Sequence, residues 1–175
     1  MKKLIVFLLF LIGFSFLRAQ SQQQISDSEV RFSIKNAGLT VEGSLGEVKG
    51  NIQFKPEMAK QAKMLVWVNV NALRTGSDLR DKHLKKKEYF DANTFPEIKM
   101  VSKFFGITEA GYKGYFVLSL KGVSKDVVIP FTYTKQGQTE MLTGSFVLNR
   151  LDYEIGGKSL VMGDEVKITI EVKLK

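Results

Sequence analysis

The sequence contains no cysteine, only one histidine (His83) and only three prolines among its 175 residues. Without cysteine the chain can form no disulfide, and it offers neither a thiol nucleophile nor a thiolate ligand for a metal. A single histidine excludes any site built from several histidines. The sequence therefore predicts no metal and no cofactor, and it carries few of the side chains on which enzymes depend.

Long apolar runs are also scarce, and the only one lies at the N-terminus, at residues 4–17. This run follows Lys2 and Lys3, carries no charge, and is shorter than the roughly 20 residues that span a bilayer as a helix. It predicts a signal peptide at residues 1–19, which directs the protein to the periplasm or out of the cell, with an uncleaved anchor as the alternative. Residues 20–175 are then one domain.

The net charge that remains after removal of the predicted signal peptide is modest. Lys2, Lys3 and Arg18 leave with the leader, so 23 of the 26 basic residues remain against 18 acidic residues, a net charge of +5. A nucleic-acid-binding domain concentrates far more positive charge along one face. We therefore expect no nucleic-acid partner.

Apolar and polar residues alternate with a period of two along most of this domain. The clearest examples are residues 30–35, 48–55, 66–71, 98–103 and 165–173. Such alternation predicts strands with one dry and one wet face, which are typical of antiparallel sheets. Glycine-containing turns separate roughly eight strands, enough to close a barrel. The fold class predicted is all-β, an extended antiparallel β-barrel.

One segment, residues 77–90, departs from this pattern and favours a short helix near 78–90. Leu79, His83 and Phe90 fall on one face of that helix, so we expect His83 to be half-buried beneath it. Arg80 and Asp81 are expected to fasten the helix to the barrel by hydrogen bonds. Catalysis or metal binding by Asp81 and His83 is the alternative role of this segment.

The apolar residues of the strands form the candidate ligand-binding set. They are Phe32, Ile34, Ile52, Phe54, Val66, Val68, Val70, Met100, Phe104, Phe116, Leu118, Phe131, Phe146, Leu148, Ile168 and Ile170. In a small barrel such side chains either fill the interior or line a dry tube. The sequence leaves both open, although Gly50, Ser102 and Gly114 on the same faces are expected to leave room.

Several motifs in a fixed order resemble the YceI family of exported, lipocalin-like proteins. They are Thr75, Arg80-Asp81-x-His83-Leu84, Tyr89-Phe90-Asp91, Phe95-Pro96-x-Ile98, Ser102, Gly114-x(3)-Leu118-x-Leu120-x-Gly122-Val123-Ser124-Lys125 and Asn149-Arg150-x-Asp152-Tyr153. Their order and spacing extend over about 80 residues, whereas each fragment alone is a weak signal. Lys121 and Glu154 depart from the family pattern.

The resemblance implies a lipocalin-like barrel with a helical segment beside its mouth. Its pore would hold one long apolar chain, such as a polyisoprenoid, an isoprenoid quinone, or a fatty acid or amide, for transport or storage. The resemblance implies no enzymatic activity. Polar groups for the head of the lipid are expected among Arg80, Asp81, His83, Ser102 and Arg150.

Two other functions remain open at this point. One is an enzyme that acts on a lipid or isoprenoid, with Asp81 and His83 as acid–base groups. The other is a filled barrel that serves as a stress or interaction protein. A transient contact with a membrane surface, for which Lys85–Lys87 are candidates, and a homodimer are further associations that the sequence admits.

Overall fold

The computed structural model describes residues 23–175. The predicted signal peptide therefore lies outside the described residues. The strands are β1 (Ile25–Asn36), β2 (Leu39–Ser44), β3 (Lys49–Gln53), β4 (Lys63–Asn69), β5 (Glu97–Thr108), β6 (Gly111–Leu120), β7 (Val123–Gln136), β8 (Thr139–Asn149) and β9 (Met162–Leu174). The helices are α1 (Asp78–Leu84) and three 3₁₀ turns, η1 (Pro56–Gln61), η2 (Val70–Ala72) and η3 (Arg150–Tyr153). Among the described residues no helix is long and apolar enough to cross a bilayer.

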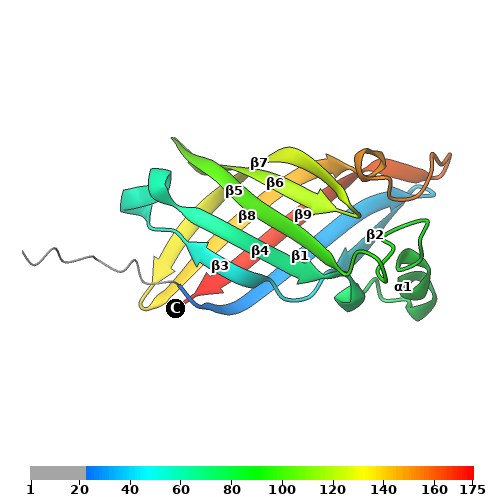
Figure 1. The fold of residues 1–175 in the computed structure, drawn as a ribbon, viewed down its shortest axis with the longest axis horizontal. Helices are drawn as coiled ribbons and strands as arrows, with labels where there is room; N and C mark the ends of the chain where they lie inside the picture. The colour runs from blue at the N-terminus through cyan, green and yellow to red at the C-terminus, as the bar shows by residue number, and fades with distance from the viewer. Residues whose placement is uncertain (1–22) are drawn as a thin grey trace, which may run out of the picture.

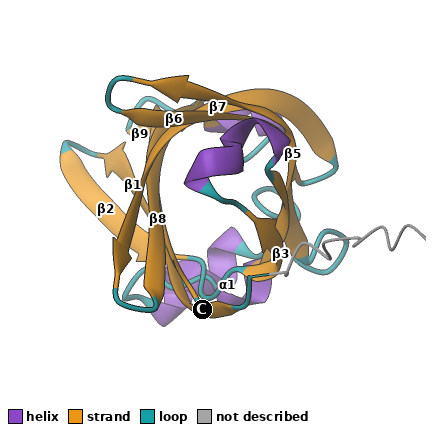
Figure 2. Ribbon diagram, turned by 90° about the vertical axis from the view of Figure 1, so that its left-hand side faces the viewer, coloured by secondary structure: helices purple, strands orange, loops and turns teal. Residues whose placement is uncertain are grey.

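The nine strands form one antiparallel sheet in the order β2-β1-β9-β8-β7-β6-β5-β4-β3. The sheet curls until its strands surround a common axis (Figure 2), and the strands run obliquely along the length of the molecule (Figure 1). The all-β antiparallel barrel is therefore confirmed. The strand number is nine rather than about eight, because the region from Gly38 to Phe54 breaks at residues 45–48 into β2 and β3.

Strands β2 and β3 are the two edges of the sheet. Where these edges approach each other, the barrel is closed by a few hydrogen bonds and not by a continuous ladder. The backbone N–H of Leu45 donates to the carbonyl oxygen of Val30 at 2.9 Å, and the N–H of Val48 donates to Ser28 Oγ at 2.8 Å. An isolated bridge pairs Gln23 with Ile52. This seam is weaker than the continuous ladders between the other neighbouring strands.

Tight turns hold the neighbouring strands in register. Ala37 and Gly38 connect β1 to β2, and both have positive φ, at 49° and 79°. Two consecutive positive φ values are typical of the two-residue turns that match the twist of an antiparallel hairpin. The turn sets Asn36 opposite Leu39 and Ile34 opposite Val41. As a result, the lumen-facing residues of β1 and β2 lie side by side.

Candidate functional site

The barrel encloses an apolar lumen with a volume of about 240 Å³. Every strand contributes lining side chains, from Val30 on β1 to Val172 on β9. A single buried water needs roughly 10–15 Å³, and apolar cavities of about 150 Å³ stay dry and bind small hydrocarbons. The lumen is thus more than ten times larger than a one-water void and has the chemistry of a hydrocarbon site. The barrel is hollow, which argues against the filled-barrel alternative.

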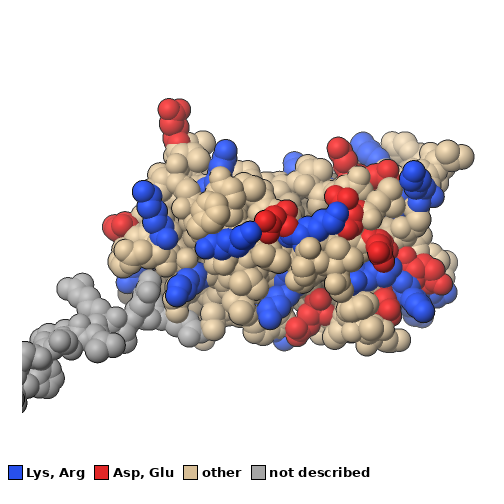
Figure 3. Space-filling view, turned by 45° about the horizontal axis from the view of Figure 1, so that its top comes forward, with Lys and Arg blue, Asp and Glu red and all other residues tan. Residues whose placement is uncertain are grey.

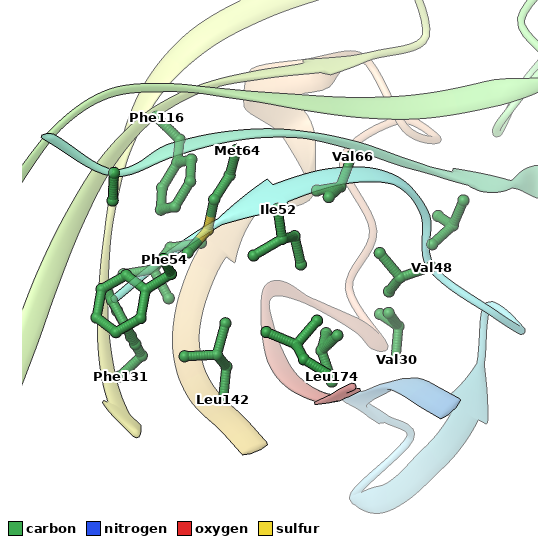
Figure 4. Packing of buried hydrophobic residues seen from close by; sticks show 14 of the residues in the cluster. Val30, Val48, Ile52, Phe54, Met64, Val66, Phe116, Phe131, Leu142 and Leu174 are labelled. Atoms are coloured by element: carbon green, nitrogen blue, oxygen red, sulfur yellow. The ribbon is translucent and has the colours of Figure 1, made fainter. Parts of the chain in front are cut away.

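Most of the apolar residues predicted to face inward line this lumen. They are Phe32, Ile34, Ile52, Val66, Val68, Met100, Phe116, Leu118, Phe131, Phe146, Leu148, Ile168 and Ile170. Figure 4 shows how side chains from different strands, such as Val30, Ile52 and Leu142, point toward one another across the interior. Their contact with a ligand remains a prediction, whereas their inward orientation is a property of the structure.

Phe54 closes one end of the lumen. It has no exposed surface, and its ring packs edge-on against Phe131 at 5.3 Å and Tyr112 at 5.0 Å between ring centroids. Phe105 and Tyr133 complete this aromatic floor. Phe54 was predicted to face a ligand, but it lies in the floor behind the lining residues.

Phe104 does not face the lumen, and the prediction that it does is wrong. A β-bulge between Ser102 and Phe104 shifts the register of β5 against β6. Because one extra residue reverses the alternation, Phe105 turns inward and Phe104 turns outward. Phe104 is 52% exposed and stacks on Tyr115 of the outer wall, with 4.1 Å between the ring centroids.

Val70 is buried but does not line the lumen. Strand β4 ends at Asn69, whose side-chain oxygen accepts a hydrogen bond from the N–H of Asn71 and caps the 3₁₀ turn η2. The N–H of Val70 donates to the carbonyl oxygen of Pro96 at 2.8 Å. The period-two pattern thus stops one residue before Val70, which packs beside the barrel wall instead.

The small residues expected to leave room in the interior do not line the lumen. Gly114 is covered by the rings of Phe116 and Phe105, and Gly50 by the backbone of β4. Ser102 sits at the β5 bulge, where its Oγ accepts a hydrogen bond from the N–H of Met64 at 2.9 Å. These three residues allow close packing of the wall. The free space comes from the width of the curled sheet.

At the end opposite the aromatic floor, polar side chains join the lining. We call this end the mouth; its polar lining residues are Asn36, Thr75, Arg80 and Arg150. Helix α1, the β1–β2 turn and the loop before β9 lie at this end of the molecule (Figure 1). The lumen is partly open to solvent. A ligand that enters here would place its polar group beside these four residues and its apolar part deeper inside.

Arg80 is held at the mouth by a short chain of hydrogen bonds. Its Nε donates to Thr75 Oγ1 at 2.8 Å, and its Nη2 donates to the carbonyl oxygen of Thr75 at 2.7 Å. Thr75 in turn donates from its N–H and its hydroxyl to Asp81 Oδ1 at 2.8 and 2.6 Å. Asp81 is buried and does not line the lumen, so it positions Arg80 through Thr75. The hydrogen bonds predicted for Arg80 and Asp81 are present, but they tie α1 to the segment that precedes it and not directly to a strand of the barrel.

Arg150 is 2% exposed and holds the loop before β9. Its guanidinium donates to the carbonyl oxygens of Ile155, Gly157 and Gly163 at 2.8–2.9 Å, and to Asp164 Oδ1 at 2.8 Å. A longer bond of 3.4 Å reaches the carbonyl of Met162. All five N–H groups thus have acceptors within the protein, and Arg150 has a structural role beside its place in the lining.

His83 is exposed rather than half-buried, contrary to expectation. Helix α1 ends at Leu84 instead of continuing toward residue 90. Its outward face carries Leu79 and His83, and the His83 ring contacts Tyr89 at 4.9 Å between ring centroids. No hydrogen bond joins Asp81 and His83 in the described chain. The arrangement expected of an acid–base pair is therefore missing.

Several residues that line the lumen are absent from the predicted ligand-binding set. Tyr89 and Phe90 follow α1 in irregular backbone, and Leu45 lies in the loop between β2 and β3, where no periodicity marks an inward side chain. Leu142 and Val172 also line the lumen. Both continue the period-two pattern of their strands, so the same signal that found their neighbours would have found them.

One side of the outer wall carries charges of both signs. Figure 3 views one side of the barrel, on which basic and acidic side chains are interspersed among uncharged ones. Three exposed pairs on the wall are Lys103–Asp126 at 2.8 Å, Lys125–Asp152 at 3.0 Å and Lys173–Asp27 at 2.8 Å. Such a surface gives no support for a nucleic-acid interface. Among the described residues, no group of three or more His, Asp or Glu could hold a metal ion.

Comparison with known proteins gives matches over the described part of the chain. The model of the YceI-like domain matches residues 22–174. A UPF0312 protein of Yersinia enterocolitica is 31% identical over 109 residues, which are 62% of this chain and 57% of that relative. A UPF0312 protein of Pseudomonas savastanoi is 29% identical over 138 residues, 73% of this chain and 71% of the relative. The chain thus spans little more than half of the Yersinia relative.

Solved structures share the fold at low sequence identity. BcnA of Burkholderia cenocepacia is 23% identical with a TM-score of 0.80, and the match covers 85% of this chain and 96% of that one. A polyisoprenoid binding domain from Saccharophagus degradans is 14% identical with a TM-score of 0.66, over 88% of this chain and 97% of that one. The similarity establishes the same architecture in all three proteins.

Proposed function

The chain belongs to the YceI-like domain family, and on that premise we propose that it is a lipid-binding protein whose lumen holds one long apolar chain. The observation that carries the proposal is the distribution of polarity in the lumen. The walls are apolar along their length, and within residues 23–175 the charged side chains of the lining, Arg80 and Arg150, lie at the mouth. This arrangement suits a molecule with one small polar end and a long hydrocarbon tail.

The hydrocarbon supplies the affinity. Transfer of each methylene group from water into an apolar site is favourable by about 0.8 kcal/mol. A polyisoprenoid, an isoprenoid quinone, or a fatty acid or amide therefore needs no special polar contact for its tail. We favour the isoprenoid class because the Saccharophagus domain, which has the same architecture, is a polyisoprenoid binding domain.

Arg80 is the proposed contact for the polar head of the lipid. Two of its guanidinium nitrogens are bound to Thr75, and Nη1 has no acceptor among the described residues. A guanidinium held this way presents its remaining donors in a fixed orientation, which favours a phosphate, carboxylate or carbonyl oxygen. Arg150 is a weaker candidate, since its donors are already bound to the loop before β9.

Export completes the proposed function. The basic start, the apolar run at residues 4–17 and Ala19 support a signal peptide at residues 1–19, followed by the binding domain at residues 20–175. A protein in the periplasm or outside the cell would then carry or store a molecule that water does not dissolve.

The test is to purify the protein, extract it with organic solvent and identify the extracted lipids by mass spectrometry. Leu148→Trp would fill the lumen from β8, whereas Val147→Trp places the same ring on the outer wall, where Val147 is 58% exposed. We expect the parent and Val147→Trp to yield a long-chain lipid and Leu148→Trp to yield much less. Lipid-free parent protein that also takes up no added polyprenol or fatty amide would contradict the proposal.

A further inference from the structure

Four large apolar side chains stand exposed around the mouth. We call this set the apolar rim: Leu39 is 73% exposed, Leu79 80%, Leu160 fully and Val161 59%. They come from the start of β2, from α1 and from the loop before β9, three segments far apart in the sequence that lie at the same end of the barrel (Figure 1). Exposed apolar residues gathered at one end often mark an interaction site.

The rim continues the lumen rather than lying beside it. On the β1–β2 hairpin, the paired residues Ile34 and Val41 line the lumen, and the next pair toward the turn on the same face is Asn36 and Leu39. Leu39 therefore extends the apolar row past the end of the cavity and into solvent.

Hydrogen bonds attach the remaining rim segments to the mouth. The N–H of Ala37 donates to the carbonyl oxygen of Val161 at 2.8 Å, so the loop before β9 is fixed to the β1–β2 turn. Leu79 directly precedes Arg80, whose guanidinium is bound to Thr75. The rim is thus placed by the same contacts that shape the mouth.

Basic side chains accompany the rim. Residues 78–90 contain five basic and three acidic residues, and one of the acids, Asp81, is buried and bound to Thr75. Lys82 lies about one helical turn beyond Leu79 on α1, and Lys86 follows the end of that helix. Both are exposed, as is Lys158 two residues before Leu160. Apolar tips among lysines match the acyl boundary and the negative headgroups of an anionic bilayer.

We propose that the apolar rim docks onto the surface of an anionic phospholipid bilayer and turns the mouth of the lumen toward the lipid. This inference rests on the proposed function, because docking matters only if the lumen accepts a lipid tail. The tail would then pass from the bilayer into the barrel without crossing bulk water. Removal of a long chain from a bilayer through water costs about 0.8 kcal/mol for each exposed methylene, so a sealed contact at the mouth would speed loading.

The test is flotation with vesicles of phosphatidylglycerol and phosphatidylethanolamine. The rim variant is Leu79→Glu with Leu160→Glu, and the matched control is Ile107→Glu with Val147→Glu. Ile107 is 62% exposed near the far end of β5, and Val147 is 58% exposed on the outer wall. We expect the rim variant to lose about tenfold or more in vesicle binding and the control to bind as the parent does. Binding should weaken in high salt and on vesicles of phosphatidylcholine alone.

Two results would overturn docking. One is vesicle binding by the rim variant equal to that of the parent, and the other is an equal loss in the control. Self-association of the parent in light scattering, abolished in the rim variant and without vesicle binding, would assign the rim to a second copy of this chain. Unchanged thermal unfolding of both variants would show that a loss of vesicle binding does not come from misfolding.

Loading experiments separate this inference from the proposed function. Uptake of a fluorescent polyprenol is measured once from detergent micelles and once from the same vesicles. If the parent takes polyprenol from neither, the proposed function fails. If it loads from micelles and fails to bind vesicles, docking alone fails. We expect the rim variant to load normally from micelles and about tenfold more slowly from vesicles.

Discussion

Thr75 donates two hydrogen bonds to one oxygen of Asp81, from its backbone N–H at 2.8 Å and from its hydroxyl at 2.6 Å. Both residues are buried, with 8% and 5% of their surface exposed. The Thr75 hydroxyl also accepts a hydrogen bond from Arg80 Nε at 2.8 Å. The orientation of an arginine at the lumen mouth thus depends on a carboxylate that does not reach the lumen.

We therefore predict that Asp81→Ala destabilises the protein and weakens lipid binding. The variant leaves two buried donors of Thr75 without an acceptor, which should lower the free energy of unfolding by about 3 kcal/mol. Urea unfolding measures this change. Asp78→Ala is the control on the same helix; Asp78 is exposed, so its loss should stay below about 1 kcal/mol.

A double-mutant cycle tests the mechanism behind this prediction. Once Asp81 is Ala, the further change Thr75→Val should cost much less than it does in the parent. Equal costs in both backgrounds would show that the two residues act independently.

Phe54→Ala should deepen the lumen. The change removes the centre of the aromatic floor, with an expected loss of about 3–5 kcal/mol in the free energy of unfolding. Phe54→Leu is the gentler variant if the alanine variant does not fold. In a series of fatty acids, the chain length bound most tightly should shift upward in the Phe54 variants.

Phe104→Ala is the matched control for the floor. Phe104 lies on the outer wall and loses only its stacking with Tyr115, which is worth about 0.5–1.5 kcal/mol. Its preferred chain length should equal that of the parent. A shift in this control as well would show that chain length does not depend on the floor.

The contrast between Phe104 and Phe105 shows how far periodicity alone predicts this fold. On β1, β8 and β9 the alternation holds over the lumen segment, and Phe32, Phe146 and Ile168 face inward as predicted. On β5 a single bulge after Ser102 exchanges the inward and outward orientation of every later residue. A bulge needs no distinctive residue type, so the pattern on one strand cannot locate it.

The polar network at the mouth was predicted only in outline. The motif around Arg80 and Asp81 correctly indicated hydrogen bonds that fasten α1. The acceptors of Arg150 could not be foreseen, because most of them are backbone carbonyls of irregular loop residues. A carbonyl oxygen is present at every residue, and only the folded path of the loop brings these particular ones together.

Arg150→Met should loosen the loop before β9 more than it alters the barrel. The substitution leaves the carbonyl oxygens of Ile155, Gly157 and Gly163 without their donor and Asp164 without its partner. We expect a loss of about 3 kcal/mol, because several hydrogen bonds from a charged donor are lost, whereas the half-exposed Asp164 carboxylate stays hydrated. Hydrogen exchange should rise sharply in residues 154–163 and little in β5 and β6. Uniformly raised exchange would instead indicate global destabilisation.

Tyr153 should make the stability of the fold sensitive to alkaline pH. Burial, and to a smaller extent the charge of Asp152, raises the pKa of the Tyr153 phenol above its ordinary value of 10.0. Because the folded-state pKa exceeds the unfolded one, the stabilising contribution is fully present below pH 10 and is lost as the pH rises through the raised pKa.

Tyr153→Phe removes this ionisable group. Urea titrations at a series of pH values measure the free energy of unfolding of the parent and of the variant. Between pH 7 and a pH above 10, this free energy should fall less in the variant than in the parent. Burial, followed by the charge of Glu140, also raises the pKa of Tyr133, so some alkaline loss should persist in the single variant. Tyr153→Phe combined with Tyr133→Phe should reduce it further. Parallel curves for the parent and Tyr153→Phe would mean that the Tyr153 phenol ionises equally well in the folded and unfolded chains.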